Sequence, residues 1–337
     1  TAPIWEPTVP ASAIDAVLIG AGSVGGAAVY TLSYLPQLSG RLTMVDPQQL
    51  EPHNPDRALL ATAAAAAAAA GYCKIDVAAR ALAHHEPGLS VSTHLGTVTD
   101  YHATLDRDAP LPLVLAAVDS APARRAIQDC LPLDLINAAC HPHEITVSRH
   151  RTDDGPCVCC LHMSDVLDRN GTKVRVLARD TGLNERMVTE LLIRRVPLAD
   201  AHIAGIEKHR QLPAGSFARY RGASLEDLWR DQLLYGVTPV STASGATAAV
   251  AAPYLTALAG TLLAAEALKA RTPDAAPYRL GTTGPAIRYT ENPTAGPSYA
   301  RLDNPQRWAG SECLCRSARR LRLLRARYGL TEGDNGT

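Results

Sequence analysis

The most constraining feature of this chain is a short apolar run that leads directly into a glycine-rich turn. Residues 14–19 have the composition of a buried strand, and Gly20, Gly22 and Gly25 follow in a Gly-x-Gly-x-x-Gly pattern. Such glycines let the backbone turn tightly and approach a phosphate, while the start of the next helix offers unpaired N–H groups and a positive dipole end. The sequence therefore predicts a helix over 27–35 with a nucleotide site at its start.

A second apolar strand, predicted over 41–45, ends in Asp46, whose carboxylate can hold the two hydroxyls of a ribose. Further segments alternate in type: we expect helices at 74–84 and 123–131, and strands at 90–93, 111–118, 135–138 and 144–150. This alternation is typical of an α/β protein with a doubly wound, mostly parallel sheet covered by helices. Ligands bind such sheets outside the carboxyl ends of the strands, so the glycine turn, Asp46 and Asp119 are expected to share one crevice.

Bulk composition excludes several classes of partner. Lys plus Arg equals Asp plus Glu, 33 each, so the chain has no net field that would draw it to nucleic acid or an anionic membrane. The uncharged stretch 246–265 is mainly alanine and contains Pro253 and Gly260, so we interpret it as a buried helix and not as a membrane span. The given sequence does not open on a secretion signal, and we expect a cytoplasmic protein.

Composition also divides the chain. Residues 165–236 are richer in charge and carry helical patterns such as that over 184–193, which predicts a helical lobe inserted into the sheet domain. The predicted units are an N-terminal arm (1–13), a nucleotide-binding half (14–164), the inserted helical lobe (165–236), the C-terminal part of the sheet domain (237–316) and a basic helical tail (317–337).

Charged residues after the first two strands narrow the choice of nucleotide. Asn54 and Arg57 follow Asp46, and the Arg57 guanidinium could hold phosphate oxygens in a planar fork. Lys74 lies at a predicted helix start, where a second cation favours a triphosphate. Asp119 ends the apolar strand 111–118, where a carboxylate could hold Mg²⁺. Each residue also has a simpler interpretation: Asn54 as a turn cap, Lys74 as a solvated helix residue and Asp119 as a helix cap.

Two close cysteine pairs predict a metal site. Among eight cysteines, Cys157 and Cys160 form a Cys-x-x-Cys pair, and Cys313 and Cys315 form a Cys-x-Cys pair. Clustered cysteines in a chain without a secretion signal point to metal or catalysis before disulfides. Four thiolates would make a closed, tetrahedral structural Zn²⁺ site, and buried thiols without metal are the alternative.

The order of these motifs resembles that of the ubiquitin-activating-enzyme-like superfamily, the ThiF/MoeB/HesA adenylyltransferases. The resemblance covers about residues 14–160 and 236–315. The matching segments are Gly20 to Gly25, Asp46, Asn54-Pro55-Asp56-Arg57, Gly71 to Lys74, Val118-Asp119-Ser120, Asn137 to Cys140, and the long helix that ends near Lys269.

This resemblance implies a Rossmann-like, ThiF-type fold, usually homodimeric, that uses ATP and Mg²⁺ to adenylate the C-terminal carboxylate of a ubiquitin-like protein or a peptide. It also implies roles for individual residues: phosphate binding for Gly20, Gly22 and Gly25, ribose binding for Asp46, charge neutralisation at the triphosphate for Asn54, Arg57 and Lys74, and Mg²⁺ binding for Asp119. Arg57, Lys74 and Asp119 would then be the catalytic set, because charge builds on the phosphate oxygens as pyrophosphate departs.

The chain departs from the family pattern at several points. Ala58 stands where the family usually has Gln, and Ser120 stands where it usually has Asn. No cysteine lies between Cys160 and Cys313, the interval in which members that form a thioester or persulfide keep a nucleophile. The acyl-adenylate is therefore expected to pass to a separate nucleophile, and the remaining candidate thiol, Cys140, is expected to be inert.

Three alternatives stay open. An NAD-dependent oxidoreductase would share the glycine motif but would leave the two cations and four cysteines unexplained. A non-catalytic ThiF-fold protein that binds a partner would account for Ala58 and Ser120. A third possibility keeps the adenylation but makes the acceptor a tRNA base or an antibiotic precursor.

Overall fold

The computed structural model describes most of the chain in segments that build one sheet, its covering helices and a helical lobe. The described residues are 12–35, 38–50, 58–60, 71–85, 88–106, 109–111, 113–141, 144–151, 155–161, 171–194, 196–229, 237–241, 247–251, 253–271, 286–292, 296–302 and 313–330. The predicted ligands Asn54 and Arg57 and nearly all of the predicted arm 1–13 lie outside this set.

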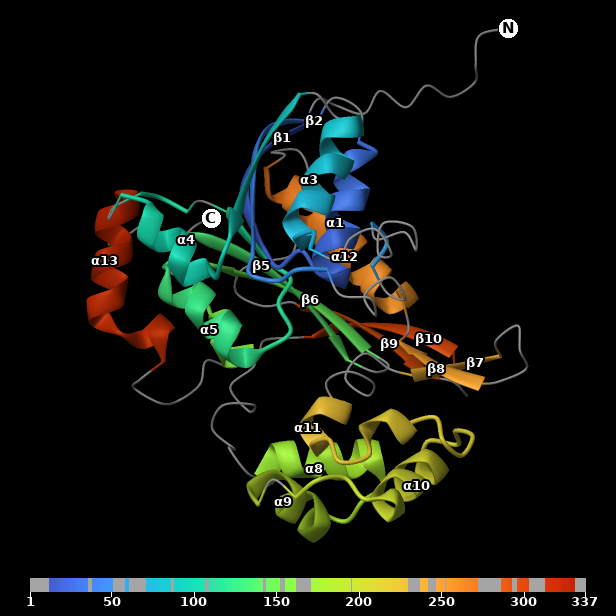
Figure 1. Ribbon diagram of the computed structural model, residues 1–337. Helices are drawn as coiled ribbons and strands as arrows, with labels where there is room; N and C mark the ends of the chain where they lie inside the picture. Colours follow the sequence, from blue (N-terminus) through green and yellow to red (C-terminus); the bar gives the residue numbers. More distant parts are fainter. Residues whose placement is uncertain are drawn as a thin grey trace, which may run out of the picture.

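Eight of the described strands form one sheet, in the order β10-β9-β6-β5-β4-β1-β2-β3 (Figure 1). The parallel strands are β1 (Ser12–Ile19), β2 (Leu38–Asp46), β3 (Leu89–Leu95), β4 (Leu113–Ala116) and β5 (Asp134–His141). The antiparallel strands are β6 (Glu144–Arg151), β9 (Ala286–Asn292) and β10 (Gly296–Leu302). The chain moves outward from β1 to β3 and then returns to β4 on the other side of β1. This reversal confirms the expected doubly wound, mostly parallel sheet.

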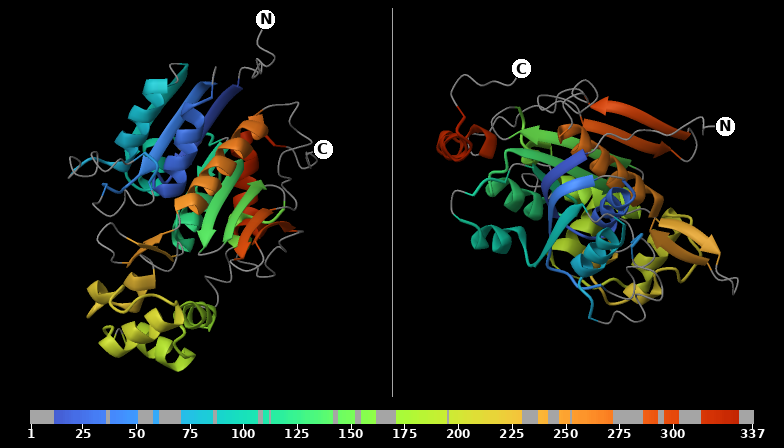
Figure 2. Two further views of the ribbon diagram at one scale, coloured as in Figure 1. Left: turned by 90° about the vertical axis from the view of Figure 1, so that its right-hand side faces the viewer. Right: turned by 90° about the horizontal axis from the view of Figure 1, so that it is seen from above.

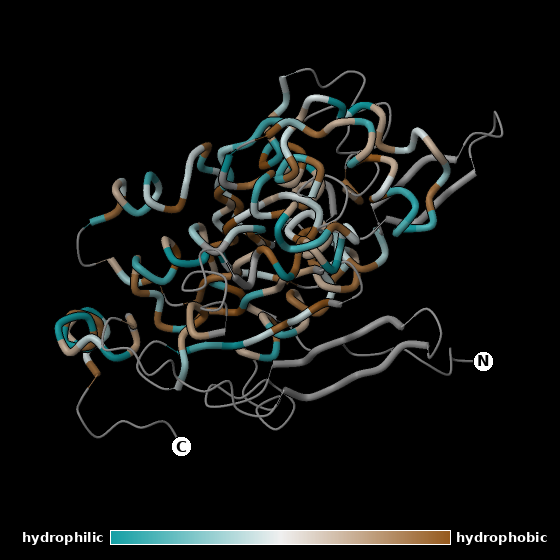
Figure 3. The backbone as a smooth tube through the Cα atoms, turned by 90° about the horizontal axis from the view of Figure 1, so that it is seen from below, coloured by the Kyte–Doolittle hydropathy of each residue, from teal (hydrophilic) through white to brown (hydrophobic). Residues whose placement is uncertain are grey.

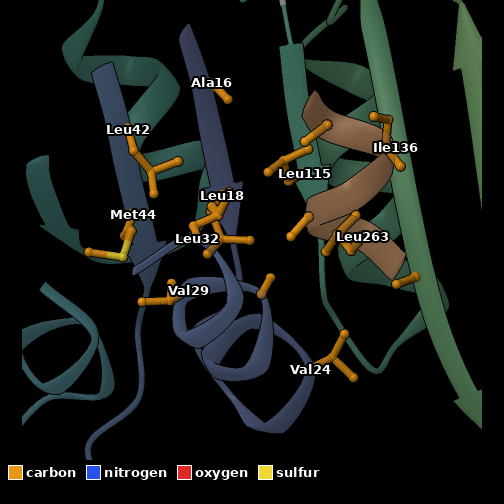
Figure 4. Packing of buried hydrophobic residues seen from close by; sticks show 14 of the residues in the cluster. Ala16, Leu18, Val24, Val29, Leu32, Leu42, Met44, Leu115, Ile136 and Leu263 are labelled. Atoms are coloured by element: carbon orange, nitrogen blue, oxygen red, sulfur yellow. The ribbon is translucent and has the colours of Figure 1, made fainter. Parts of the chain in front are cut away.

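Helices cover both faces of the sheet (Figures 1 and 2). One face carries α1 (Ser23–Ser33), α3 (Lys74–His85) and α12 (Pro253–Arg271); the other carries α4 (Val98–Thr104), α5 (Ala121–Asp129), α6 (Val158–Leu161) and α13 (Ala318–Tyr328). Side chains alternate along β1 to serve both layers. Ala16 and Leu18 join the core under α1 and α12, while Val17 and Ile19 join the core on the opposite face. Figure 4 shows the first of these layers in close-up.

Helix α12 crosses α1 at close range. A Cβ atom at Gly260 would lie 2.4 Å from the Val24 carbonyl oxygen, so only glycine permits this approach. The prediction of a buried helix over 246–265 is therefore confirmed for the helix itself, but the predicted start of the helix is wrong. Residues 247–251 form β8, which pairs with β7 (Val237–Ser241) in a separate hairpin, and the helix begins at Pro253. Proline fits the first turn of a helix because its missing N–H has no partner there.

The charged segment that lies between the two cysteine pairs forms helices with a core of their own. These are α8 (Gly171–Thr181), α9 (Glu185–Ile193), α10 (Asp200–His209) and α11 (Leu225–Leu228), below the sheet in Figure 1. Their buried cluster includes Leu177, Val188, Ile206, Phe217 and Leu228. The helical content is as expected, and the exact bounds of the lobe stay a prediction.

Helix α13 closes the described part of the chain. In Figure 3 it lies at the left edge with many hydrophilic residues on it. Its inner side nonetheless docks on the domain, because Leu324 is buried and the Tyr328 hydroxyl accepts a hydrogen bond from the Leu111 N–H at 2.8 Å. Arg320 forms an ion pair with Asp129 of α5. Among the described residues, no helix combines the length and apolar character that crossing a membrane requires.

Candidate nucleotide site and metal centre

The glycine turn between β1 and α1 is packed against its neighbours on two sides. Gly20 has a φ of +94°, and its N–H donates to the Val45 carbonyl at 2.9 Å. A Cβ atom at Gly25 would lie 1.8 Å from the Gly20 carbonyl oxygen, which excludes any larger residue without a backbone shift. Gly22 differs, because a Cβ atom there would meet nothing within 4 Å. Gly22 is also the N-cap of α1, so the open side of this turn faces the unpaired N–H groups of a helix start.

Asp46 ties this turn to the end of β2. Its carboxylate is buried; Oδ2 accepts the Ala21 N–H and Oδ1 accepts the Gln48 N–H, each at 2.7 Å. Each carboxylate oxygen can accept more than one hydrogen bond. Asp46 can therefore hold the glycine turn in place and still accept from the hydroxyls of a ribose, the role expected from the sequence.

Lys74 is held beside the same strand end. It is the first residue of α3, and its backbone N–H donates to the Gln48 carbonyl at 3.1 Å. Its Nζ donates to Gln48 Oε1 at 2.6 Å. The ammonium group thus lies close to the residues that follow Asp46, and its expected role at a nucleotide's phosphates stays a prediction.

Asp119 lies on the other side of the glycine turn, in the loop between β4 and α5, and is exposed. This loop contacts the turn directly, since the Ala117 N–H donates to the Ile19 carbonyl at 2.9 Å and a Cβ atom at Gly20 would lie 2.5 Å from Ala117 O. The N-cap of α5 is Ser120, whose Oγ accepts the Ala123 N–H. The alternative interpretation of Asp119 as the helix cap is therefore wrong, and the expected strand 111–118 is shorter, at Leu113–Ala116.

Arg124 is a residue to which the sequence analysis gave no role. It is buried; its Nε donates to Asn137 Oδ1 at 3.1 Å, and its Nη2 donates to the Val118 carbonyl at 2.6 Å. One guanidinium thus links β5 to the residue before Asp119. The available signal was an arginine five positions after Asp119 on an amphipathic helix.

We call residues 20–25, Asp46, Lys74 and the loop 117–120 the glycine-loop edge. Parallel strands β1, β2 and β4 all end here, and β1 lies between the other two. The structure brings the glycine turn and Asp46 into direct contact, with Lys74 on the β2 side and Asp119 on the β4 side. The placement of Asn54 and Arg57 at this edge stays a prediction, because both lie outside the described residues.

The four predicted metal ligands come together in one cluster, which we call the cysteine cluster: Cys157, Cys160, Cys313 and Cys315. Their sulfur atoms all lie within 4.8 Å of one another, and five of the Sγ–Sγ distances are between 3.4 and 3.8 Å. A tetrahedral Zn²⁺ with Zn–S bonds of about 2.3 Å requires sulfur atoms about 3.8 Å apart. All four cysteines are free thiols. The cluster can hold a metal ion such as zinc.

Short turns and a buried histidine shape the cysteine cluster. The Cys160 N–H donates to the Cys157 carbonyl and the Arg316 N–H to the Cys313 carbonyl, each at 2.9 Å. The ring of His150 contacts the Pro156 carbonyl oxygen through Nδ1 at 2.9 Å, next to the first ligand. Burial lowers the pKa of His150 to about 4, so the ring is neutral at pH 7. A neutral ring adds no positive charge beside the four thiols.

Comparison with known proteins decides the family. The model of the ThiF family matches residues 11–296, most of the chain. The protein belongs to the ThiF family. The uncharacterized protein y4jF of Sinorhizobium fredii (strain NBRC 101917 / NGR234) is 26% identical over 318 residues, which is 93% of this chain and 58% of that protein.

Solved structures agree on the fold. The crystal structure of E. coli MccB matches with a TM-score of 0.51 and 13% identity, over 91% of this chain and 66% of that one. The structure of E. coli MccB with selenomethionine MccA gives a TM-score of 0.50 and 13% identity, over 90% and 66%. The chain thus spans 58 to 66% of the length of these relatives. At this identity the likeness shows the fold alone.

Within this ThiF-family chain, Cys140 lies near the carboxyl end of β5. Its Sγ contacts the Leu255 carbonyl oxygen at 3.7 Å, and burial raises the pKa of the thiol to about 12. A thiol with such a pKa is protonated at neutral pH and is a poor nucleophile. This environment favours the expectation that Cys140 is inert.

Proposed function

We propose that this ThiF-family protein uses MgATP to adenylate a carboxylate at the C-terminus of a small protein or peptide. Pyrophosphate leaves, and the acyl-adenylate passes to a separate nucleophile. The observation that supports this most is the glycine-loop edge itself. The helix start at Gly22 is open. Asp46, whose carboxylate could bind a ribose, and Lys74 lie on one side of it, and the exposed carboxylate of Asp119 lies on the other.

The proposed reaction needs these groups for a physical reason. A carboxylate oxygen of the substrate forms a bond to the α-phosphorus, and the bond from that phosphorus to the bridging oxygen of pyrophosphate breaks. Negative charge grows on the phosphate oxygens, where Lys74, Arg57 and the N–H groups of α1 would stabilise it. Asp119 would hold Mg²⁺, which when bound offsets charge on the departing pyrophosphate.

The substrate class is proposed on two grounds. MccB, whose fold this chain shares, has been solved with MccA bound, and the family resemblance implies a protein or peptide terminus. We infer that the helical lobe of α8 to α11 shapes the approach of that substrate. We also propose that the protein is a homodimer and that zinc in the cysteine cluster has a structural role.

Two other functions remain distinct candidates. The Gly-x-Gly-x-x-Gly pattern alone would suit an NAD-dependent oxidoreductase. A non-catalytic partner-binding protein is favoured by Ser120 and Ala58: the first serves α5 as its N-cap, and the second packs against Leu50. The nucleotide that the protein binds distinguishes these three functions, because only the proposed enzyme would bind ATP with Mg²⁺ and release pyrophosphate.

The direct test is ATP–pyrophosphate exchange screened against peptides with free C-termini. Asp119→Ala and Lys74→Ala should each lower exchange at least about tenfold, since each removes a charge that acts on the phosphates. Asp106→Ala and Lys208→Ala are matched controls, because both residues are exposed and lie away from the glycine-loop edge. Tight NAD binding without ATP binding would overturn the proposal, as would ATP binding that does not depend on Mg²⁺.

A further inference from the structure

The inner side of α13 is fixed to the domain at several points. Besides the contacts described above, Arg327 Nη1 donates to the Cys130 carbonyl at 2.8 Å, and the Tyr328 hydroxyl contacts the Leu131 carbonyl oxygen at 3.1 Å. The residues that dock, at positions 320, 324, 327 and 328, recur at helical spacing on one side. The opposite side of α13 is therefore held in a defined orientation, pointing away from the domain.

We define the outer face of α13 as Arg319, Arg322, Leu323 and Ala326, which follow one another at spacings of three and four residues. All four residues are exposed, and Leu323 is 54% exposed. Within the part of the chain that the structure describes, neither arginine of this face forms an ion pair, whereas Arg320 on the inner side pairs with Asp129. The outer face thus combines two unpaired guanidinium groups with an aliphatic side chain.

The charge of this segment is one-sided. Residues 313–330 contain six arginines and no Asp or Glu. Arginine stays protonated at any physiological pH, and like charges one turn apart repel each other. Arg319 also lies in the first turn of α13, where the positive end of the helix dipole disfavours a cation. The outer arginines therefore do not stabilise the helix that carries them, and their placement favours contact with an anionic partner.

Leu323 distinguishes a protein partner from a nucleic acid. An exposed aliphatic side chain gains from contact with another apolar group, which a phosphate backbone does not offer. Protein interfaces, in contrast, commonly surround an apolar centre with polar residues and are enriched in arginine. The complementary surface is an aliphatic side chain with carboxylates one turn away on either side, and an acidic amphipathic helix presents that pattern.

We propose that the outer face of α13 docks an acidic amphipathic helix of another protein. An aliphatic side chain of that helix packs on Leu323 and Ala326, and its carboxylates pair with Arg319 and Arg322. The burial of Leu324 and the contacts of the inner side hold the face in place before the partner arrives, which lowers the entropy cost of binding.

This docking surface is separate from the glycine-loop edge. Helix α13 lies beside α5, on the face of the sheet opposite to α1 (Figure 1). Its last residue, Tyr328, contacts Leu111 and Leu131, which precede β4 and β5 and so lie at the amino ends of these strands. The nucleotide is expected at the carboxyl ends. The inference therefore does not rest on the proposed function, and a partner on α13 leaves the nucleotide site open.

The test is fluorescence anisotropy of a labelled peptide on the full chain, at about 0.15 M salt so that weak surface attraction is screened. The probe is a capped peptide of about 16 residues, built from Glu, Ala and Leu at helical spacing and long enough to form a helix. A second peptide has serine in place of each leucine and the same net charge, and should bind about fivefold more weakly. A single-stranded oligonucleotide of equal charge should bind more weakly than the leucine peptide.

Variants of the outer face separate its two components. Arg319→Glu combined with Arg322→Glu should weaken binding of the leucine peptide at least about tenfold. Leu323→Ser changes no charge and should weaken it about fivefold.

Two matched controls should keep full affinity for the peptide. Arg186→Glu combined with Lys208→Glu makes the same charge change at exposed positions of the helical lobe. Leu95→Ser removes an equally exposed leucine, at 56%, from β3.

Each outcome supports or overturns the inference. Equal affinity for the leucine and serine peptides would overturn it, since charge alone would then explain binding. Tighter binding of the oligonucleotide, lost in the double arginine variant, would assign this face to nucleic acid instead. A wild-type protein that does not bind the leucine peptide also overturns it. Should the double arginine variant lose hydrogen-exchange protection over 318–328, Leu323→Ser and the serine peptide decide, because both leave the arginines in place.

Discussion

The glycine-loop edge and the cysteine cluster are both held together by contacts between residues distant in the sequence, but the sequence separations differ greatly. The bonds from Asp46 to Ala21 and from Lys74 to Gln48 join residues 25 and 26 positions apart. The contacts from Cys313 to Cys157 and Cys160 join residues 156 and 153 positions apart. The first region is assembled by neighbouring strands of one sheet, and the second brings the end of the described chain back to its middle.

The two regions also differ in what holds them. At the glycine-loop edge, backbone N–H groups satisfy the one buried carboxylate, so this region is organised before any ligand binds. In the cysteine cluster, four thiols surround a space that suits a cation, and their deprotonated forms would repel one another without it. Ligand removal should therefore leave the fold of the first region intact and weaken that of the second.

The largest expected effect is the loss of metal from the cysteine cluster. Cys157→Ser, or chelation of the wild type, should remove stoichiometric zinc and lower the free energy of unfolding by about 4 kcal/mol or more, because the cluster fastens α13 to the domain. Metal analysis and thermal unfolding measure both effects, and hydrogen exchange should show lost protection over 318–328. Cys73→Ser, outside the cluster, should keep zinc and stability. A wild type purified without zinc would refute the assignment.

The next largest effects come from two glycines of the same turn, one needed for packing and the other expected to be needed for ligand binding. Gly25→Ala places a methyl group against the Gly20 carbonyl and should cost about 3 kcal/mol of stability. Gly22→Ala meets no neighbouring atom, so thermal unfolding should be unchanged while ATP binds at least about tenfold more weakly, because the methyl group occupies the space that a phosphate approaches. Full ATP affinity in a folded Gly22→Ala variant would show that no phosphate binds at this turn.

A smaller effect is expected when Arg124, which supports the loop that carries Asp119, is replaced. Lysine at position 124 cannot donate in a fork to both Asn137 and the Val118 carbonyl, so Asp119 should lose part of its orientation. Arg124→Lys should raise the Mg²⁺ concentration that half-saturates pyrophosphate exchange by about fivefold, near 1 kcal/mol. The matched control is Arg125→Lys, the exposed neighbour on the same helix. An unchanged Mg²⁺ dependence would make Arg124 a structural residue only.

These contrasts also explain which parts were predictable. The parallel sheet and the position of Asp46 followed from local periodicity, because carboxyl ends of parallel strands meet at one edge whatever the details of packing. The cysteine cluster was predictable because closely spaced thiols have few roles in a chain of this kind. The Arg124–Asn137 link and the three bonds of Gln48 were not, since they depend on how helices α5 and α3 seat against the sheet.

The start of α12 shows a further limit of sequence reasoning. Residues 247–251 and the helix after them have similar alanine-rich compositions, so periodicity alone could not separate a strand from a helix. Pairing with β7 decided the matter, and that pairing is a tertiary contact. Proline at 253 was the one local signal of the boundary.

The smallest expected effect is at Cys140, and it decides whether a covalent step exists. Burial raises the pKa of this thiol to about 12, so the thiol is protonated at pH 7. Cys140→Ala should therefore leave pyrophosphate exchange and acyl transfer to an added nucleophile within about twofold of wild type. A thioester detected by mass spectrometry on the wild type, and lost in Cys140→Ala but not in Cys130→Ala, would instead make Cys140 the acceptor. Substrate binding would then have to open the contact between Cys140 Sγ and the Leu255 carbonyl oxygen, because the thiol would have to reach the acyl-adenylate. The same variant therefore tests whether this contact is as fixed as the bonds of the glycine-loop edge.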